Sequence, residues 1–206
     1  MIGEFRTGLI VSADGAKHPA RSDRQGALVI ADSHGRYTEP AFRQTMCFSY
    51  CAARATSVPA TAMIGNIVWN PPGSGVVLAM GPWTAQIQVT SATCFGIGLA
   101  YSAQAITPTT TTAADAYGST YLNAGSPGNC NAKCYAIGTL LVVPTMVMNL
   151  YHNTAAIATT GVDIMAGDLQ GQFIVPPVYV VCLAAINAAV AAAGMTSTLT
   201  WEEIPE

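Results

Sequence analysis

The side chains of this chain that could carry chemistry are six cysteines, three histidines and a small number of carboxylates. Four of the cysteines form two C-x3-C pairs, Cys47 with Cys51 and Cys130 with Cys134. This spacing is found in some zinc sites, where further ligands would come from the histidines at positions 18, 34 and 152. Residues four apart on a strand share a face, however, and buried cysteines usually act as small apolar side chains. The sequence therefore predicts packing cysteines, with no metal site and no cofactor.

The state of the cysteine thiols depends on the compartment in which the chain is made. The first residues, MIGEFRTGLIVSADG, lack the basic region, long apolar core and cleavage site of a secretory signal. We therefore expect synthesis in a cytoplasm and reduced thiols. If the protein later meets an oxidising medium, the expected disulfide is Cys130–Cys134, because both cysteines lie in the turn-rich stretch GSPGNCNAKC.

Catalytic motifs are absent from the sequence, which has no G-x-S-x-G elbow, no phosphate-binding loop ending in Gly-Lys-Ser/Thr and no H-E-x-x-H helix. Asp32-Ser33-His34 holds the residue types of a catalytic triad, but a triad is defined in space and consecutive residues point in different directions. Asp163 and Asp168 are candidates for an acid and base pair across a cleft. Aspartate beside glycine is also ordinary turn chemistry. The sequence predicts a protein that is not an enzyme.

Charge is scarce and unevenly distributed. Charged side chains make up 9% of the 206 residues, against about 25% in a typical soluble domain. A net charge of −3 argues against a nucleic-acid binder, which would gather basic side chains on one face. Seven of the eight basic residues lie in the first 54 positions, and from Ala55 to Trp201 the only charged residues are Asp115, Lys133, Asp163 and Asp168. Such a neutral body suits subunit packing, because interface cores are depleted in charge.

One apolar stretch, from Pro177 to Gly194, approaches the length of a membrane span. Much of it is alanine, Asn187 lies in its middle, and no basic residue follows Lys133 to set an orientation. We therefore expect no membrane association.

Period-2 alternation and clusters of turn residues predict that the body consists of β-strands. The expected strands cover residues 47–53, 62–69, 76–80, 85–90, 93–101, 136–143, 145–150, 173–175, 178–184 and 195–202. The segments 136–143 and 145–150 are expected to pair with each other or to form one strand bent at Pro144. About eight strands with loops between them match a β-sandwich, of which the jelly roll is the commonest eight-stranded form.

Glycine and proline mark where these strands end or bend. Asn70-Pro71-Pro72-Gly73-Ser74-Gly75 is expected to be a turn between two strands, because Pro-Pro-Gly cannot continue a ladder. Gly96 and Gly98 indicate a bulge or a close approach of two backbones.

Three stretches carry a resemblance to a family of tailed-phage virion proteins. They are DRQGALVIADSHGRY at Asp23–Tyr37, WNPPGSGV at Trp69–Val76 and LTWEEIP at Leu199–Pro205. The matched motifs are structural, and between residues 100 and 160 the match is diffuse. The resemblance implies a polar arm followed by a β-sandwich, in a capsid cement or decoration protein or a fibre component that is usually a homotrimer. It implies no catalytic residues.

Together these observations predict an all-β, jelly-roll-like β-sandwich at residues 46–206 with an extended N-terminal arm at residues 1–45. The expected function is to stabilise a phage head as a cement or decoration protein, in a virion assembled in the host cytoplasm. The expected partners are the major capsid protein and copies of this chain, with the arm docking through Arg21, Arg24, Arg36, Tyr37, Arg43 and Arg54. Arginine is suited to this because it forms bidentate pairs with carboxylates. The alternative for the arm is a solvated, flexible terminus.

Two other functions stay open. A tail or head-fibre component would bind a receptor or host glycan, with Trp83, Tyr117 or Tyr121 as stacking platforms. Tryptophans in β-rich chains more often fill the core, however. A hydrolase on the same fold would depend on Asp163 and Asp168 alone.

Overall fold

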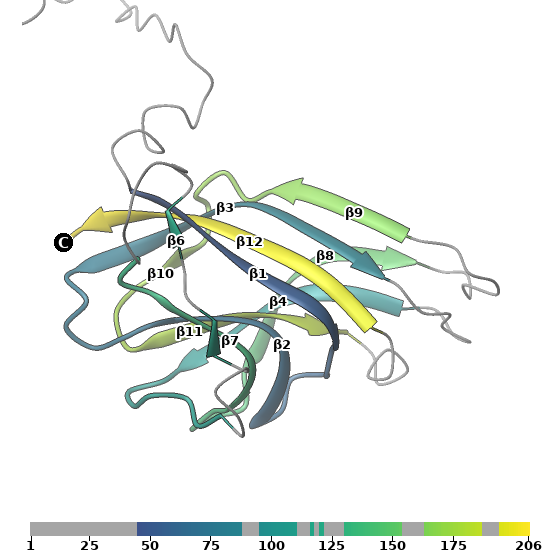
Figure 1. Ribbon diagram of the computed structural model, residues 1–206, viewed down its shortest axis with the longest axis horizontal. Helices are drawn as coiled ribbons and strands as arrows, with labels where there is room; N and C mark the ends of the chain where they lie inside the picture. The colour runs from purple at the N-terminus through teal and green to yellow at the C-terminus, as the bar shows by residue number, and fades with distance from the viewer. Residues whose placement is uncertain are drawn as a thin grey trace, which may run out of the picture. The chain divides into compact units, whose positions relative to one another are not determined.

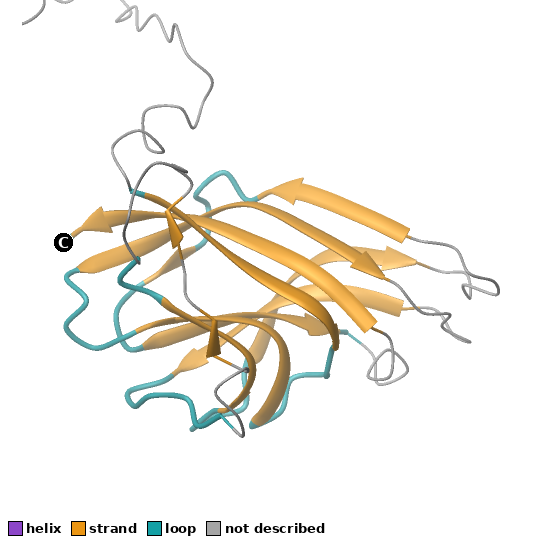
Figure 2. Cartoon of the chain, in the orientation of Figure 1, coloured by secondary structure: helices purple, strands orange, loops and turns teal. Residues whose placement is uncertain are grey.

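The structure, a computed structural model, describes residues 45–87, 95–110, 116–117, 120–121, 130–153, 163–186 and 194–206. In these residues every regular element is a β-strand (Figure 2). The strands are β1 (Met46–Ala55), β2 (Ala62–Asn70), β3 (Val76–Ile87), β4 (Phe95–Ala103), β5 (Ala116–Tyr117), β6 (Thr120–Tyr121), β7 (Lys133–Thr139), β8 (Thr145–Asn153), β9 (Asp163–Asp168), β10 (Ile174–Val175), β11 (Tyr179–Ala185) and β12 (Gly194–Pro205).

The strands form two antiparallel sheets that pack face to face (Figure 1). The first sheet has the order β10-β3-β12-β1-β6, with β9 also paired to β3, and the second has the order β5-β7-β2-β11-β4-β8. Each sheet contains four strands of a jelly roll, β1-β12-β3-β9 in one and β2-β11-β4-β8 in the other. The predicted jelly-roll-like β-sandwich is therefore confirmed, and the four additional strands are β7 beside β2 and the short strands β5, β6 and β10.

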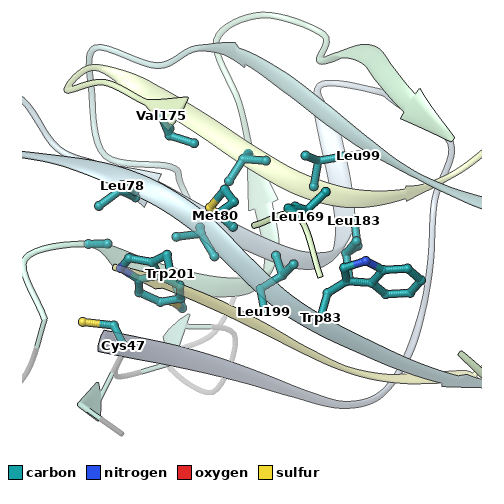
Figure 3. Close-up of a cluster of buried hydrophobic side chains, with 14 of the residues drawn as sticks. Cys47, Leu78, Met80, Trp83, Leu99, Leu169, Val175, Leu183, Leu199 and Trp201 are labelled. Carbon is teal, nitrogen blue, oxygen red and sulfur yellow. The ribbon is translucent and has the colours of Figure 1, made fainter. Parts of the chain in front are cut away.

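The main core lies between the two sheets. On β12, Met195, Leu199 and Trp201 are buried, whereas Thr196 and Thr198 on the opposite face are only half-buried. Figure 3 shows Trp201 and Leu199 of β12 in this core, together with Trp83 of β3 and with Leu99 and Leu183 of the facing sheet. This period-2 burial is the physical reason that the alternating sequence forms strands.

A polar contact joins the two sheets inside the core. Pairing between β2 and β7 is irregular from Ile64 to Ile67, and this bulge turns Asn66 inward. Ser49 Oγ on β1 donates a hydrogen bond to Asn66 Oδ1 at 2.7 Å, and Asn66 Nδ2 donates to Ser197 O at 3.3 Å. The bulge needs glycine at position 65, where φ is +147° and a Cβ would lie 2.7 Å from the Leu183 carbonyl oxygen.

The second sheet is buried on both faces. Along β11, Val181 and Leu183 belong to the main core, while Val180 and Cys182 belong to a separate cluster on the outer face of the sheet. Two chain segments, 104–110 and 140–144, cover this outer cluster, and we call them the covering segments. Leu140 is part of the cluster itself, and the Pro108 side chain lies over Gly138, where a Cβ would be 3.4 Å from it.

Two sequence predictions about strands are wrong. Residues 76–80 and 85–90 were expected to be separate strands, but β3 runs unbroken from Val76 to Ile87. It accommodates Pro82 because the pairing of β12 shifts between Leu199 and Trp201, and strand prolines are tolerated at bulges. Thr200 Oγ1 donates to Pro82 O at 2.6 Å in this bulge.

The second error concerns β7 and β8, which do not pair. β7 pairs with β2 and β5, whereas β8 pairs with β4, so β2, β11 and β4 lie between them. Residues 140–144 therefore pass over the sheet instead of forming a tight turn. Leu140 N donates to Thr61 O at 2.8 Å and Leu141 N donates to Gln104 Oε1 at 2.8 Å along this path.

The turn and glycine predictions are confirmed. Ser74 N donates to Pro71 O at 3.3 Å, and Gly73 and Gly75 have φ values of +73° and +69°. A Cβ at Gly98 would lie 2.7 Å from Met148 O of β8, so the two backbones approach closely. In the part of the chain that the structure describes, no helix is long and apolar enough to cross a membrane.

Candidate functional site

Most residues predicted to dock onto a capsid lie outside the described residues. These are Arg21, Arg24, Arg36, Tyr37 and Arg43, and of the predicted arm at residues 1–45 only Thr45 is described. Arg54 lies on β1, where its backbone pairs with Met195, but its side chain is outside the description. The first described strand begins at Met46.

The candidate acid and base pair is not assembled. Asp163 and Asp168 stand at opposite ends of β9, about 17 Å apart along the strand by its rise per residue. A glycosidase pair needs a separation of roughly 5–9.5 Å. Asp168 Oδ1 accepts a hydrogen bond from Gln170 N at 2.8 Å, which is the turn chemistry expected of it. His152 is exposed on β8, and Asp32, His34 and His18 lie outside the described residues.

The cysteine predictions are partly wrong. Cys47 forms a disulfide with Cys130, so these two thiols are not reduced and Cys130 does not pair with Cys134. The fold decides this, because it brings β1 of one sheet to the start of β7 in the other. Glu203 lies beside the disulfide, with a carboxylate oxygen within 4.8 Å of both sulfurs. Its oxygens accept hydrogen bonds from Ala132 N and Asn131 Nδ2, both at 2.9 Å.

Three other cysteines act as packing residues, as predicted. Cys51, Cys134 and Cys182 are buried and lie outside the disulfide. Cys182 Sγ donates to Ala100 O at 3.5 Å, and burial raises the pKa of this thiol to about 12. A thiol with so high a pKa stays protonated near neutral pH, so it is a poor nucleophile and metal ligand.

The tryptophans fill the core, and this corrects one sugar-binding prediction. Trp83 is only 5% exposed and packs over Gly167 of β9, so it offers no face to an external ligand. Trp69 and Trp201 are also buried. The side chains of Tyr117 and Tyr121 are outside the description.

The structure instead forms an aromatic cleft of about 320 Å³ at one end of the sandwich. Its lining residues are Tyr101, Phe173, Ile174, Val175, Pro176 and Tyr179. The rings of Tyr101 and Tyr179 stack with centroids 6.2 Å apart and an interplanar angle of 25°. Phe173 meets Tyr101 edge-on at 5.9 Å. An open cleft with aromatic walls and phenolic hydroxyls suits a ligand with an apolar face and polar edges.

Beside the cleft, between its lining residues Pro176 and Tyr179, the backbone is held in a strained conformation. Val178 has φ of +64°, which is unusual for a β-branched residue. Its N–H donates to Asn70 O at 2.9 Å, and its carbonyl accepts from Gln104 N at 2.7 Å. Asn70 Nδ2 also donates to Val175 O at 3.1 Å and Val76 O at 2.9 Å. Asn70 therefore ties the predicted turn to the cleft, and strain of this kind is often found at binding sites.

Gln104 connects the cleft to the covering segments. Its carbonyl accepts a hydrogen bond from Trp69 Nε1 at 2.8 Å. Its side-chain nitrogen donates to Ile106 O at 2.6 Å, and its side-chain oxygen accepts from Leu141 N at 2.8 Å. The side chain is almost completely buried.

Sequence reasoning missed the cleft and both organising amides. The sequence marks Asn70 only as a turn residue, and no sequence pattern indicates Gln104. Tyr101 and Tyr179 are separated by 78 positions and meet only because β4 and β11 pair. The one local signal was Pro176-Pro177 before Val178, which marks a turn.

Comparison with protein-family models, with curated proteins and with solved structures finds no match for this chain.

Proposed function

We propose that this chain is a structural protein of a tailed-phage virion that reinforces the head as a cement or decoration protein. Its jelly-roll body would pack against copies of itself, and residues 1–45 would dock onto the major capsid protein. The observation that carries the proposal is the separation of charge from apolar surface. Basic residues concentrate in the first 54 positions, whereas the body exposes large aliphatic side chains such as Ile106, Val142 and Ile164.

The physical argument rests on what each part can bind. Arginines on an arm can pair with carboxylates of a capsid lattice, and an arm that orders on binding covers much surface with few residues. The jelly roll adds a compact body of a type found in viral capsid proteins and in lectins. Fold alone does not assign a function, so the charge pattern and the resemblance of the three motifs carry the proposal further.

The test is cryo-electron microscopy of the native particle that carries this chain. Density for the jelly roll on the outside of the head, with the arm on capsid subunits, is the expected result. Density only at the tail or a fibre tip, or absence from purified particles, would refute the cement function.

A second experiment tests the arm. Replacing Arg21, Arg24, Arg36 and Arg43 together by Glu in the full chain should abolish rebinding to particles that lack it, because the carboxylate partners would be repelled. Lys133→Glu is the matched control, since Lys133 is the one basic residue between Ala55 and Trp201 and is exposed on β7. Equal binding by both variants would show that the arm does not dock through charge.

The aromatic cleft favours a second candidate function, which is glycan binding by a fibre component. A sugar ring could stack on Tyr101 or Tyr179. On an array of bacterial surface polysaccharides, the wild type should bind a defined glycan and Tyr101→Ala should lose at least tenfold in affinity. Tyr50→Ala is the control, because Tyr50 is exposed on β1 of the other sheet. An array with no binding would remove this candidate.

A further inference from the structure

Four of the exposed aliphatic side chains of the body lie together on the covering segments. Ile106 is 57% exposed, and Leu141, Val142 and Val143 are 52%, 52% and 49% exposed. We call these four residues the loop patch. The last three are consecutive in the sequence, and no charged residue occurs within 104–110 or 139–147. Three adjacent exposed aliphatic side chains are unusual on a soluble surface unless they bind something.

The fold itself does not require the loop patch to be apolar. The inward residues of the covering segments protect the outer cluster, because Leu140, Pro108 and Pro144 are buried. The patch residues lie on the same segments but are exposed to solvent. Polar side chains at those positions would leave the buried cluster covered, so the packing of the chain itself does not account for their apolar character.

The loop patch is also held in place by hydrogen bonds. Gln104 bonds to the backbone of Ile106 and of Leu141 with its two side-chain groups, which joins the covering segments to each other. Thr109 and Thr139 exchange two backbone hydrogen bonds of 3.2 and 2.8 Å. A surface that is ordered before binding loses less conformational entropy when a partner covers it.

We infer that the loop patch is the self-association surface of this protein and that the same patch of a second copy covers it. An isologous contact sets this uncharged surface against an identical uncharged surface. The charge-bearing first 54 residues, or a charged partner, would bury charges against it without compensation. The four side chains expose roughly 400 Å² per copy, about half of what one partner contributes to a standard interface. Association through the patch alone should therefore be weak and concentration-dependent.

This self-association rests on the proposed function, in which the body packs against copies of itself. It is tested with the purified full chain in the absence of phage particles. Sedimentation velocity over roughly 5–500 µM should show the wild type passing from monomer to dimer. Val142→Asp should weaken the association constant at least tenfold, because like charges would meet across the contact. Ile164→Asp is the matched control, since Ile164 is 71% exposed on β9 and outside the patch.

A wild type that stays monomeric throughout this range, or association that is lost in Ile164→Asp and kept in Val142→Asp, would overturn the inference. Far-UV circular dichroism checks that each variant is folded. Val142→Thr keeps the side-chain shape and should weaken association by a smaller factor, so the test does not depend on tolerance of aspartate. A monomeric result would reject this surface only, because attachment to the capsid is tested separately by density on the native particle.

Discussion

The Cys47–Cys130 disulfide should make a large contribution to stability, because it closes a loop of 83 residues. In the chain-entropy treatment, a cross-link of that span removes about 15 cal/mol/K from the unfolded ensemble, or about 4.5 kcal/mol at 25 °C. For a chain of this size the loss corresponds to a fall in Tm of about 15 °C. The perturbation is the double variant Cys47→Ala/Cys130→Ala, examined by urea and thermal unfolding.

A single control separates the cross-link from packing. Cys134→Ala also removes a buried sulfur beside the same core but leaves the disulfide intact, so its smaller loss can be subtracted. The wild type should also lose stability when refolded with a reductant, whereas the double variant should not respond. The reasoning fails if the double variant unfolds within about 1 kcal/mol of Cys134→Ala. It also fails if peptide mapping finds Cys47 and Cys130 alkylated in denaturant without reductant.

Two further predictions concern buried polar groups. Gln104→Ala should lower the free energy of unfolding by about 3 kcal/mol in urea titration, because Leu141 N and Ile106 O lose their partner. The control is Gln172→Ala at an exposed position, which should change the free energy of unfolding by less than about 0.5 kcal/mol. Equal effects of the two substitutions would contradict the role of Gln104. Burial raises the pKa of Cys182 in the folded protein to about 12, against an ordinary value of 9.0. Above pH 9 the thiol therefore loses its proton in the unfolded state but keeps it in the folded state. The free energy of unfolding should fall as pH rises, by about 2 kcal/mol at pH 10.5. Unfolding of Cys182→Ala measured over the same pH range should show a shallower decline, and an identical slope would exclude this thiol as the cause.

The fold class could be predicted because its signals are local. Alternation along Met195–Trp201 and turn chemistry at Asn70–Gly75 act over a few residues, and both are confirmed. The strands β1, β2 and β4 begin and end close to the expected positions. β3 is the exception, because the sequence predicts two strands at 76–80 and 85–90 where the structure has one strand that passes through Pro82. Its tolerance depends on a bulge in β12, which lies more than 100 residues further along the chain.

The candidate sites were much less predictable, because residues distant in sequence form them. The disulfide partner of Cys47 is decided by the packing of two sheets, whereas the turn-rich stretch around Cys130 favours Cys134 as its partner in an oxidising medium. The aromatic cleft depends on the pairing of β4 with β11. The docking arginines stay a prediction, since their side chains lie outside the described residues.

By itself the sequence determined that the body of this protein, in the residues that the structure describes, consists of β-strands, and that a charged N-terminal segment precedes a nearly neutral body. Composition and period-2 alternation are sufficient for that, because each residue's preference for burial or exposure acts locally. Only the tertiary structure decided which strands are neighbours, which cysteines bond, and which aliphatic side chains remain at the surface. Leu140 and Leu141 are adjacent and identical in type, yet one is buried in the outer cluster and the other is exposed. The path of residues 140–144 across the sheet sets that difference, and this path depends on long-range pairing that no short stretch of sequence contains.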